Sequence, residues 1–106
     1  MQGSNVDFLV HMEVGLIGTG EDADRLLQQE AARAKQLAGM GILRRLWRVP
    51  GRRANWGIWT TDSVDDLHAA LASLPLFPVL NITVHPLATH PNDPGLPLLQ
   101  NPTNNP

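Results

Sequence analysis

The spacing of apolar residues along this chain changes in a fixed order, and that order restricts the folds open to it. Six segments follow one another with the spacing of strand, helix, strand, strand, helix and strand: residues 8–14, 23–38, 42–49, 53–60, 64–74 and 80–85. Alternation of apolar and polar residues is typical of a strand with one buried face, and helical periodicity is typical of an amphipathic helix. The order therefore predicts an α+β domain.

This order is that of the ferredoxin-like βαββαβ fold, in which two helices cover one face of a four-stranded antiparallel sheet. The segment Val49-Pro50-Gly51-Arg52 predicts a tight hairpin turn, because proline presets one turn position and glycine tolerates a positive φ at the next. The uncovered sheet face would still carry apolar residues. We therefore expect two sheets to pair in a dimeric α+β barrel.

The composition suits one soluble domain. The chain has 106 residues, of which 42% are hydrophobic and 17% are charged, and it contains no cysteine. Because no apolar run approaches the ~20 residues that span a bilayer and residues 1–7 lack the pattern of a secretion signal, we expect a cytoplasmic protein without a membrane anchor. Five of the nine prolines lie in residues 91–106. This segment is interpreted as a C-terminal arm or tail after a domain formed by residues 1–90.

The most informative single residue is Glu30, because it falls within the apolar stripe of the first helix. At about 100° per residue, it lies among six apolar residues of that stripe: Ala23, Leu26, Leu27, Ala34, Leu37 and Ala38. A carboxylate removed from water without a partner is costly, so it is usually neutralised, paired or hydrogen-bonded. Two interpretations follow: a salt bridge to an arginine, or a general acid or base with a raised pKa.

Positive charge is concentrated in the hairpin, where five of the seven arginines lie between residues 44 and 53. The net charge of −2 argues against nucleic acid as the main partner, whereas a local group of guanidinium ions suits a small anionic ligand. If Pro50 and Gly51 form the turn, residue 48 pairs with 53, 46 with 55 and 44 with 57. One hairpin face then carries the candidate binding residues: Arg44, Arg48, Arg53, Asn55, Gly57 and Trp59.

On this face the guanidinium groups are candidates to hold a carboxylate, Asn55 to donate to a carbonyl oxygen, and Trp59 to form an apolar wall. His11, on the polar side of the first strand, would line the same cavity. A helix packed on the sheet would instead face the other side of the hairpin, which carries Arg45 and Trp56. The histidines have no recognised zinc spacing and there is no glycine-rich phosphate loop, so no metal site is expected.

Several short motifs make this chain resemble one family. They are Gly41, Arg44, Leu46-Trp47-Arg48, Gly51, Ala54-Asn55, Ser63-Val64, Leu67-His68 and Leu74-Pro75-Leu76-Phe77-Pro78. Over roughly residues 8–91 the chain resembles the muconolactone Δ-isomerase family, and Glu30 falls on the glutamate of the family's first helix. The resemblance implies a cofactor-independent isomerase of the β-ketoadipate pathway of aromatic degradation. It also implies a homo-oligomer with a dimer as its unit, up to a decamer.

The resemblance further implies the reaction, in which muconolactone becomes 3-oxoadipate enol-lactone by a shift of one proton and a C=C bond. In that reaction Glu30 would carry the proton. The strand pairing, rather than the resemblance, suggests the remaining roles: Arg48, together with Arg53 or Arg44, would hold the substrate carboxylate. Asn55 would donate to the developing oxyanion.

The chain also departs from the pattern of that family. Arg52-Arg53 stands where His-Tyr is expected, Leu43 where a tryptophan is expected, and Leu9 and His11 where a histidine and a lysine are expected. These departures leave a chloromuconolactone dehalogenase open as an alternative. Asn55 and the tryptophans also suggest a cofactor-free dimeric-barrel monooxygenase, and the cluster of arginines and tryptophans suggests a non-catalytic anion-binding module.

Overall fold

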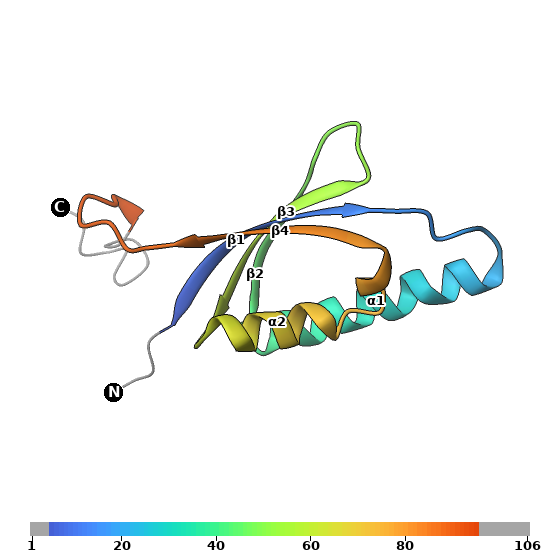
Figure 1. The fold of residues 1–106 in the computed structure, drawn as a ribbon, viewed down its shortest axis with the longest axis horizontal. Coiled ribbons are helices and arrows are strands. Elements are labelled where there is room, and N and C mark those ends of the chain that lie inside the picture. The colour runs from blue at the N-terminus through green and yellow to red at the C-terminus, as the bar shows by residue number, and fades with distance from the viewer. Residues whose placement is uncertain (1–4, 96–106) are drawn as a thin grey trace.

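The computed structural model describes residues 5–95, which fold into the predicted ferredoxin-like arrangement. Its elements are β1 (Val6–Val14), α1 (Glu21–Gly39), β2 (Leu43–Arg48), β3 (Ala54–Thr61), α2 (Val64–Ala72), the 3-10 helix η1 (Phe77–Val79) and β4 (Leu80–Leu87). The strands pair antiparallel in the order β2-β3-β1-β4. Both helices lie on one side of the sheet, and the first turns of α1 reach past the ends of the strands (Figure 1). Of the predicted C-terminal arm, only residues 91–95 fall within this description.

The two long helices begin where the local sequence favours a helix start. Ser63 precedes α2, and its hydroxyl accepts a hydrogen bond of 3.1 Å from the backbone N–H of Asp66, which is the N-cap geometry that serine favours. α1 begins after Gly20, which has a φ of 90°, and its first turn is acidic. Negative charge at this end complements the helix dipole.

The core lies between the sheet and the helices. In β1 the even-numbered residues Phe8, Val10 and Met12 are buried, while the odd-numbered residues between them are more exposed. These side chains pack with buried residues of both helices, of β3 and of the turn after α2: Leu37, Trp59, Leu67, Ala70, Leu71 and Leu74. The even-numbered side of β1 is therefore the side that the helices cover.

The β2–β3 hairpin has a different register from the one predicted. Arg48 lies opposite Asn55 and Leu46 lies opposite Gly57, two residues further along β3 than a two-residue turn at Pro50 and Gly51 would give. The loop is accordingly longer. Because the shift is an even number of residues, the residues of β2 from Arg45 onward and those of β3 stay on the faces predicted for them.

An irregularity near the start of β2 changes the face of one residue. Between Leu43 and Arg45 the register shifts, so that Leu43 pairs with Trp59 and Arg45 pairs with Ile58. Arg44 is the extra residue of this bulge. Leu43 consequently joins the partly buried residues against the core, although simple alternation predicts it on the opposite face.

The pairing of β1 with β3 decides which face of the hairpin the helices cover. Met12 lies opposite Asn55, and Phe8 lies opposite Trp59. Since directly opposed residues of paired strands point to the same side of a sheet, Asn55 and Trp59 face the helices together with Arg48. The prediction that the helices would face Arg45 and Trp56 is wrong.

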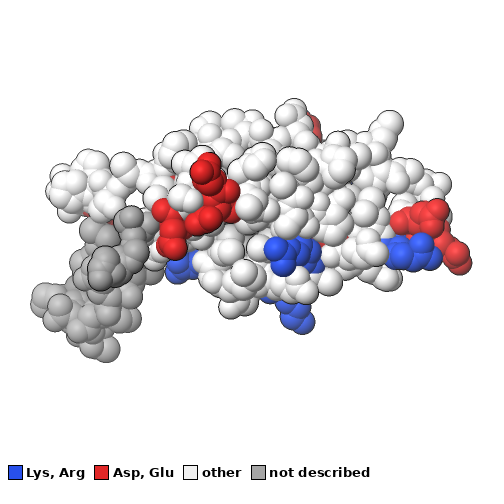
Figure 2. Space-filling view, turned by 60° about the horizontal axis from the view of Figure 1, so that its bottom comes forward, with Lys and Arg blue, Asp and Glu red and all other residues white. Residues whose placement is uncertain are grey.

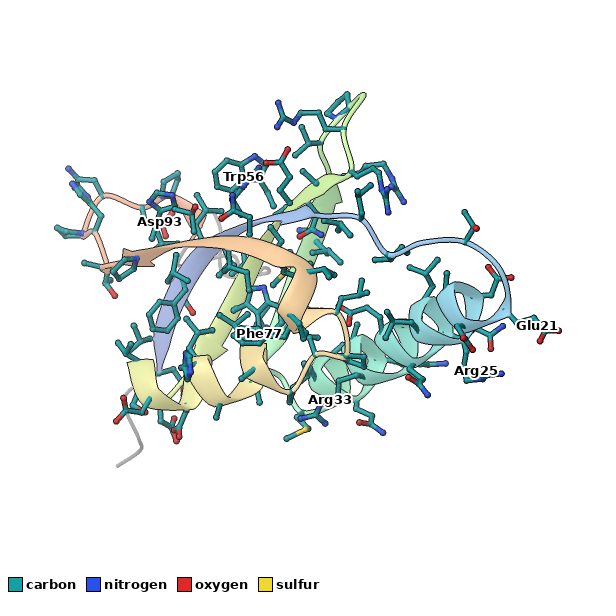
Figure 3. The ribbon with its side chains drawn as sticks, turned by 45° about the vertical axis from the view of Figure 1, so that its right-hand side comes forward. Glu21, Arg25, Arg33, Trp56, Phe77 and Asp93 are labelled. Atoms are coloured by element: carbon teal, nitrogen blue, oxygen red, sulfur yellow. The ribbon has the colours of Figure 1, made fainter. Side chains whose placement is uncertain are left out.

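The other sheet face is left uncovered in the described chain. It carries a row of aromatic side chains in which Trp47 pairs with Trp56, and Trp56 pairs with His11. Trp56 points away from the helices, whereas Phe77 lies on the helix side (Figure 3). The exposed fractions of Trp47 and Trp56 are 44% and 36%, which is high for such large apolar groups.

Candidate active site

A pocket of about 490 Å³ lies where α1 faces the ends of β1, β2 and β3. Its lining is apolar on the α1 side and contains two arginines and an amide on the hairpin side. The lining residues are Val14, Leu27, Leu46, Trp47, Arg48, Arg53, Ala54, Asn55 and Leu76. A few converging polar groups in an otherwise apolar pocket are typical of a small-molecule site.

Glu30 is not itself a lining residue of this pocket, but it is close to two residues that are. Leu27 is three residues before Glu30 on α1, and therefore on the same side of the helix. On the other side Glu30 Oε1 accepts a hydrogen bond of 2.8 Å from the backbone N–H of Leu76. Partial burial raises the pKa of Glu30 above its ordinary value, and the hydrogen bond from Leu76 opposes that shift. The carboxyl group is thus suited to gain and lose a proton closer to neutrality.

The turn after α2 presents the N–H group that donates a hydrogen bond to Glu30. Phe77 N–H donates to Leu74 C=O at 2.9 Å, and Leu76 has the φ of −83° and ψ of −1° of the third position of a type I turn. Pro75 precedes it, at the turn position where proline is favoured. Because the turn uses the N–H of Phe77, the N–H of Leu76 is left to hold Glu30.

Two of the predicted arginines line the pocket and a third does not. Arg48 and Arg53 are lining residues, and neither pairs with a carboxylate among the described residues. Arg44, in the bulge of β2, is exposed and lies outside the lining. Arg52 forms an ion pair with Glu13. The pocket therefore holds two guanidinium groups that are available to an anionic ligand.

Asn55 and Trp59 both face the helices, but at different depths. Asn55 lines the pocket, and its Oδ1 is buried without a hydrogen-bond partner among the described residues. Trp59 is only 2% exposed and lies in the core rather than in the pocket lining. Its Nε1 is likewise buried without a partner in this part of the chain.

The predicted position of His11 in the pocket is wrong. His11 lies on the uncovered sheet face, where its ring meets the edge of Trp56 with 4.6 Å between ring centroids. The reason is that the pocket opens on the apolar side of β1, next to the helices, and not on its polar side. Alternation places His11 correctly relative to Met12, but it does not say on which side the cavity lies.

Sequence reasoning missed the apolar part of the pocket and the backbone donor. Leu27 belongs to the predicted helical stripe, yet it is 45% exposed at the pocket rather than buried in the core. The N–H of Leu76 carries no side-chain signal. The only indication of it is the run Leu74-Pro75-Leu76-Phe77-Pro78, in which two prolines force a turn.

Within residues 5–95, no set of three or more histidine, aspartate or glutamate side chains is arranged so that it could hold a metal ion. In the same residues no helix is both long and apolar enough to cross a bilayer. On the helix side, charged side chains form a few small groups on a largely uncharged surface (Figure 2).

Comparison with known proteins agrees with the geometry. A family model described as Muconolactone delta-isomerase matches residues 6–93. The Muconolactone Delta-isomerase of Cupriavidus pinatubonensis is 42% identical over 87 residues, which are 80% of this chain and 95% of that protein. That of Pseudomonas aeruginosa is 39% identical over 72 residues, covering 68% and 75%. A crystal structure of muconolactone isomerase superposes with a TM-score of 0.75 at 37% identity and covers 83% of this chain and 94% of that one.

Proposed function

Because this chain belongs to the muconolactone Δ-isomerase family, we propose that it isomerises muconolactone in the pocket beside Glu30. The product is 3-oxoadipate enol-lactone. The assignment to this pocket rests on one observation. The partly buried carboxyl group of Glu30 has a raised pKa and adjoins a pocket that contains two arginines. A carboxylate with raised basicity and a site for an anion are the two things that this reaction requires.

The reaction is a proton shift within one substrate molecule. Glu30 takes the proton from the ring carbon that bears the carboxymethyl arm, and the electron pair spreads through the conjugated lactone to its carbonyl oxygen. The same carboxyl group then returns the proton to the carbon beside that carbonyl, so that the C=C bond moves and no atom is gained or lost. Leu76 N–H holds Oε1 of Glu30, which leaves Oε2 as the oxygen for transfer.

The pocket residues supply orientation and charge stabilisation. Arg48 and Arg53 bind the carboxylate of the arm, which fixes the ring relative to Glu30. Asn55 donates through its Nδ2 to the carbonyl oxygen as negative charge develops there. The apolar wall formed by Leu27 and Leu46 excludes water around the reacting ring, which strengthens these interactions.

We further propose that the protein acts in the β-ketoadipate pathway of aromatic degradation, in the cytoplasm, as a homo-oligomer. The row of exposed aromatic side chains on the uncovered sheet face supports assembly, because a surface of this kind is rarely left to solvent. A second copy of the same chain would present the same face, which allows a symmetric dimer.

The variant Glu30→Gln tests the assignment. The purified full chain should turn over muconolactone in metal-free buffer, and Glu30→Gln should lose activity by ~10³-fold or more, because glutamine cannot accept the proton. The matched control is Glu21→Gln, which changes an exposed glutamate at the start of the same helix and should leave turnover unchanged. Unimpaired turnover by Glu30→Gln would remove Glu30 from the mechanism.

A further inference from the structure

Two buried polar atoms on β3 have no partner, which is unusual inside a protein. They are the indole Nε1 of Trp59 and the amide Oδ1 of Asn55, and no hydrogen bond to either is formed by the described residues. Buried polar atoms of this kind are nearly always paired. The two atoms belong to residues four apart on one strand, and both residues face the same side of the sheet.

The residue between them shows how the indole is placed. A Cβ atom on Gly57 would lie 3.0 Å from Nε1 of Trp59 and 3.1 Å from the carbonyl oxygen of Arg45. The indole N–H edge therefore lies directly over Gly57, on the side of the strand that leads to Asn55. No side chain larger than hydrogen fits beneath it without moving the indole. Gly57 thus makes the space in which the N–H of Trp59 sits.

One side chain, that of Leu46, lies both against Gly57 and in the lining of the pocket. Cδ1 of Leu46 would lie 3.2 Å from the same Cβ atom on Gly57, so Leu46 and the indole edge both lie against this glycine. Leu46 is also a lining residue of the pocket, it is 50% exposed, and it belongs to the edge strand β2. A rotation of this exposed side chain would bring a ligand in the pocket toward the N–H of Trp59.

We propose that Trp59 Nε1 and the Asn55 amide together form an oxyanion site behind Leu46, and that Trp59 is a catalytic residue of the isomerisation. The inference rests on the proposed function. With no partner to fix its orientation, the Asn55 amide can turn to present Nδ2 in place of Oδ1. Two donors then converge on one oxygen, which suits the lactone carbonyl as it becomes negatively charged. Binding of that oxygen gives both unpaired groups a partner.

The variant Trp59→Phe tests this assignment because it removes the N–H and keeps an aromatic ring. With muconolactone as substrate, kcat should fall at least ~10-fold and by a larger factor than KM rises, since the lost hydrogen bond forms on binding and strengthens in the transition state. The acidic limb of the pH profile, which reports on Glu30, should stay in place. The control is Trp56→Phe, the same substitution on the uncovered face of the same strand, which should leave kcat unchanged.

The opposite result has a distinct signature. If Trp59 only fills the core, Trp59→Phe should lower stability through the cavity that it leaves, but kcat should not change. That outcome would overturn the inference and leave the proposed function intact, provided that the wild-type chain turns over muconolactone. Absence of turnover by the wild-type chain would overturn both.

A spectroscopic measurement gives a readout besides activity. In the Glu30→Gln variant labelled with 15N at its three indoles, muconolactone binds without reacting. The Trp59 indole N–H resonance, assigned through Trp59→Phe, should move downfield when muconolactone is added, and that of Trp56 should not. A Trp59 resonance that stays in place at saturating muconolactone would contradict the proposed hydrogen bond.

Discussion

Glu30 owes its acid–base character to its position against the turn after α2. Burial makes its ionised form less favourable, and the single N–H of Leu76 compensates only in part. The carboxyl group therefore has a pKa above the ordinary value of 4.5. A glutamate in an ordinary ion pair would have the opposite shift, so the salt-bridge interpretation of this residue is not supported.

This shift makes a prediction about stability. The folded chain holds the Glu30 proton more tightly than the unfolded chain, so ionisation costs stability as pH rises above 4.5 and through the folded-state pKa. Glu30→Gln cannot ionise. It should be more stable than the wild-type chain at pH 8, and the difference should shrink toward pH 4.

Urea denaturation of both proteins at the two pH values measures this difference. A difference that grows as the pH falls would contradict the direction of the shift. Together with the loss of turnover, a gain in stability at pH 8 would mean that the wild-type chain gives up stability in order to keep its proton carrier.

At the scale of elements, the β2–β3 hairpin supplies the polar half of the pocket. Its longer loop and its bulge change the pairing, but the even shift keeps Arg48 and Asn55 on one face. The prediction that these two side chains share a face is therefore confirmed, although the predicted register, which did not pair them, is wrong. Arg44 is excluded by the bulge, which alternation cannot foresee.

The hairpin arginines should act on substrate binding more than on chemistry. Arg48→Gln and Arg53→Gln should each raise KM for muconolactone about 10-fold, because each removes a charge-assisted hydrogen bond to the carboxylate arm, and should change kcat much less. Arg44→Gln, on the same hairpin and outside the pocket, should leave KM unchanged. Steady-state kinetics at two salt concentrations would detect the difference. Equal effects of all three variants would indicate a general effect of positive charge rather than direct binding of the substrate carboxylate by Arg48 and Arg53.

At the scale of the whole molecule, one sheet face is covered by helices and the other is not. The uncovered face places Leu9 opposite Ile58 at its centre, next to the row that contains Trp56. Both helices pack on the opposite side, so nothing within residues 5–95 can bury these side chains. Pairing with a second copy would do so, as in the expected dimeric α+β barrel.

A charge placed at the centre of that face tests the assembly. Leu9→Glu should shift the protein from an oligomer toward the monomer in sedimentation velocity at micromolar concentration, because burying an unpaired carboxylate at the interface is costly. Val64→Glu places the same charge on an exposed apolar position of α2 and should leave the oligomer intact. A wild-type chain that sediments as a monomer would contradict the proposed assembly.

The sequence by itself determined the elements, their order and the alternation within each strand. These are local properties, set by the spacing of neighbouring residues and by short signals such as Ser63 or Pro75. They were enough to predict the fold class, to select Glu30, and to place Arg48 and Asn55 together.

Only the tertiary structure decided which side of the hairpin the helices cover, where Leu76 donates its N–H, and on which side of β1 the pocket opens. Each of these depends on segments far apart in the chain, such as Glu30 and Leu76 or β1 and β3. Their alignment is fixed by packing of the whole core and not by local periodicity. For that reason His11 and Arg44 fall outside the pocket, while the tryptophan predicted as an apolar wall lies buried with an unpaired N–H.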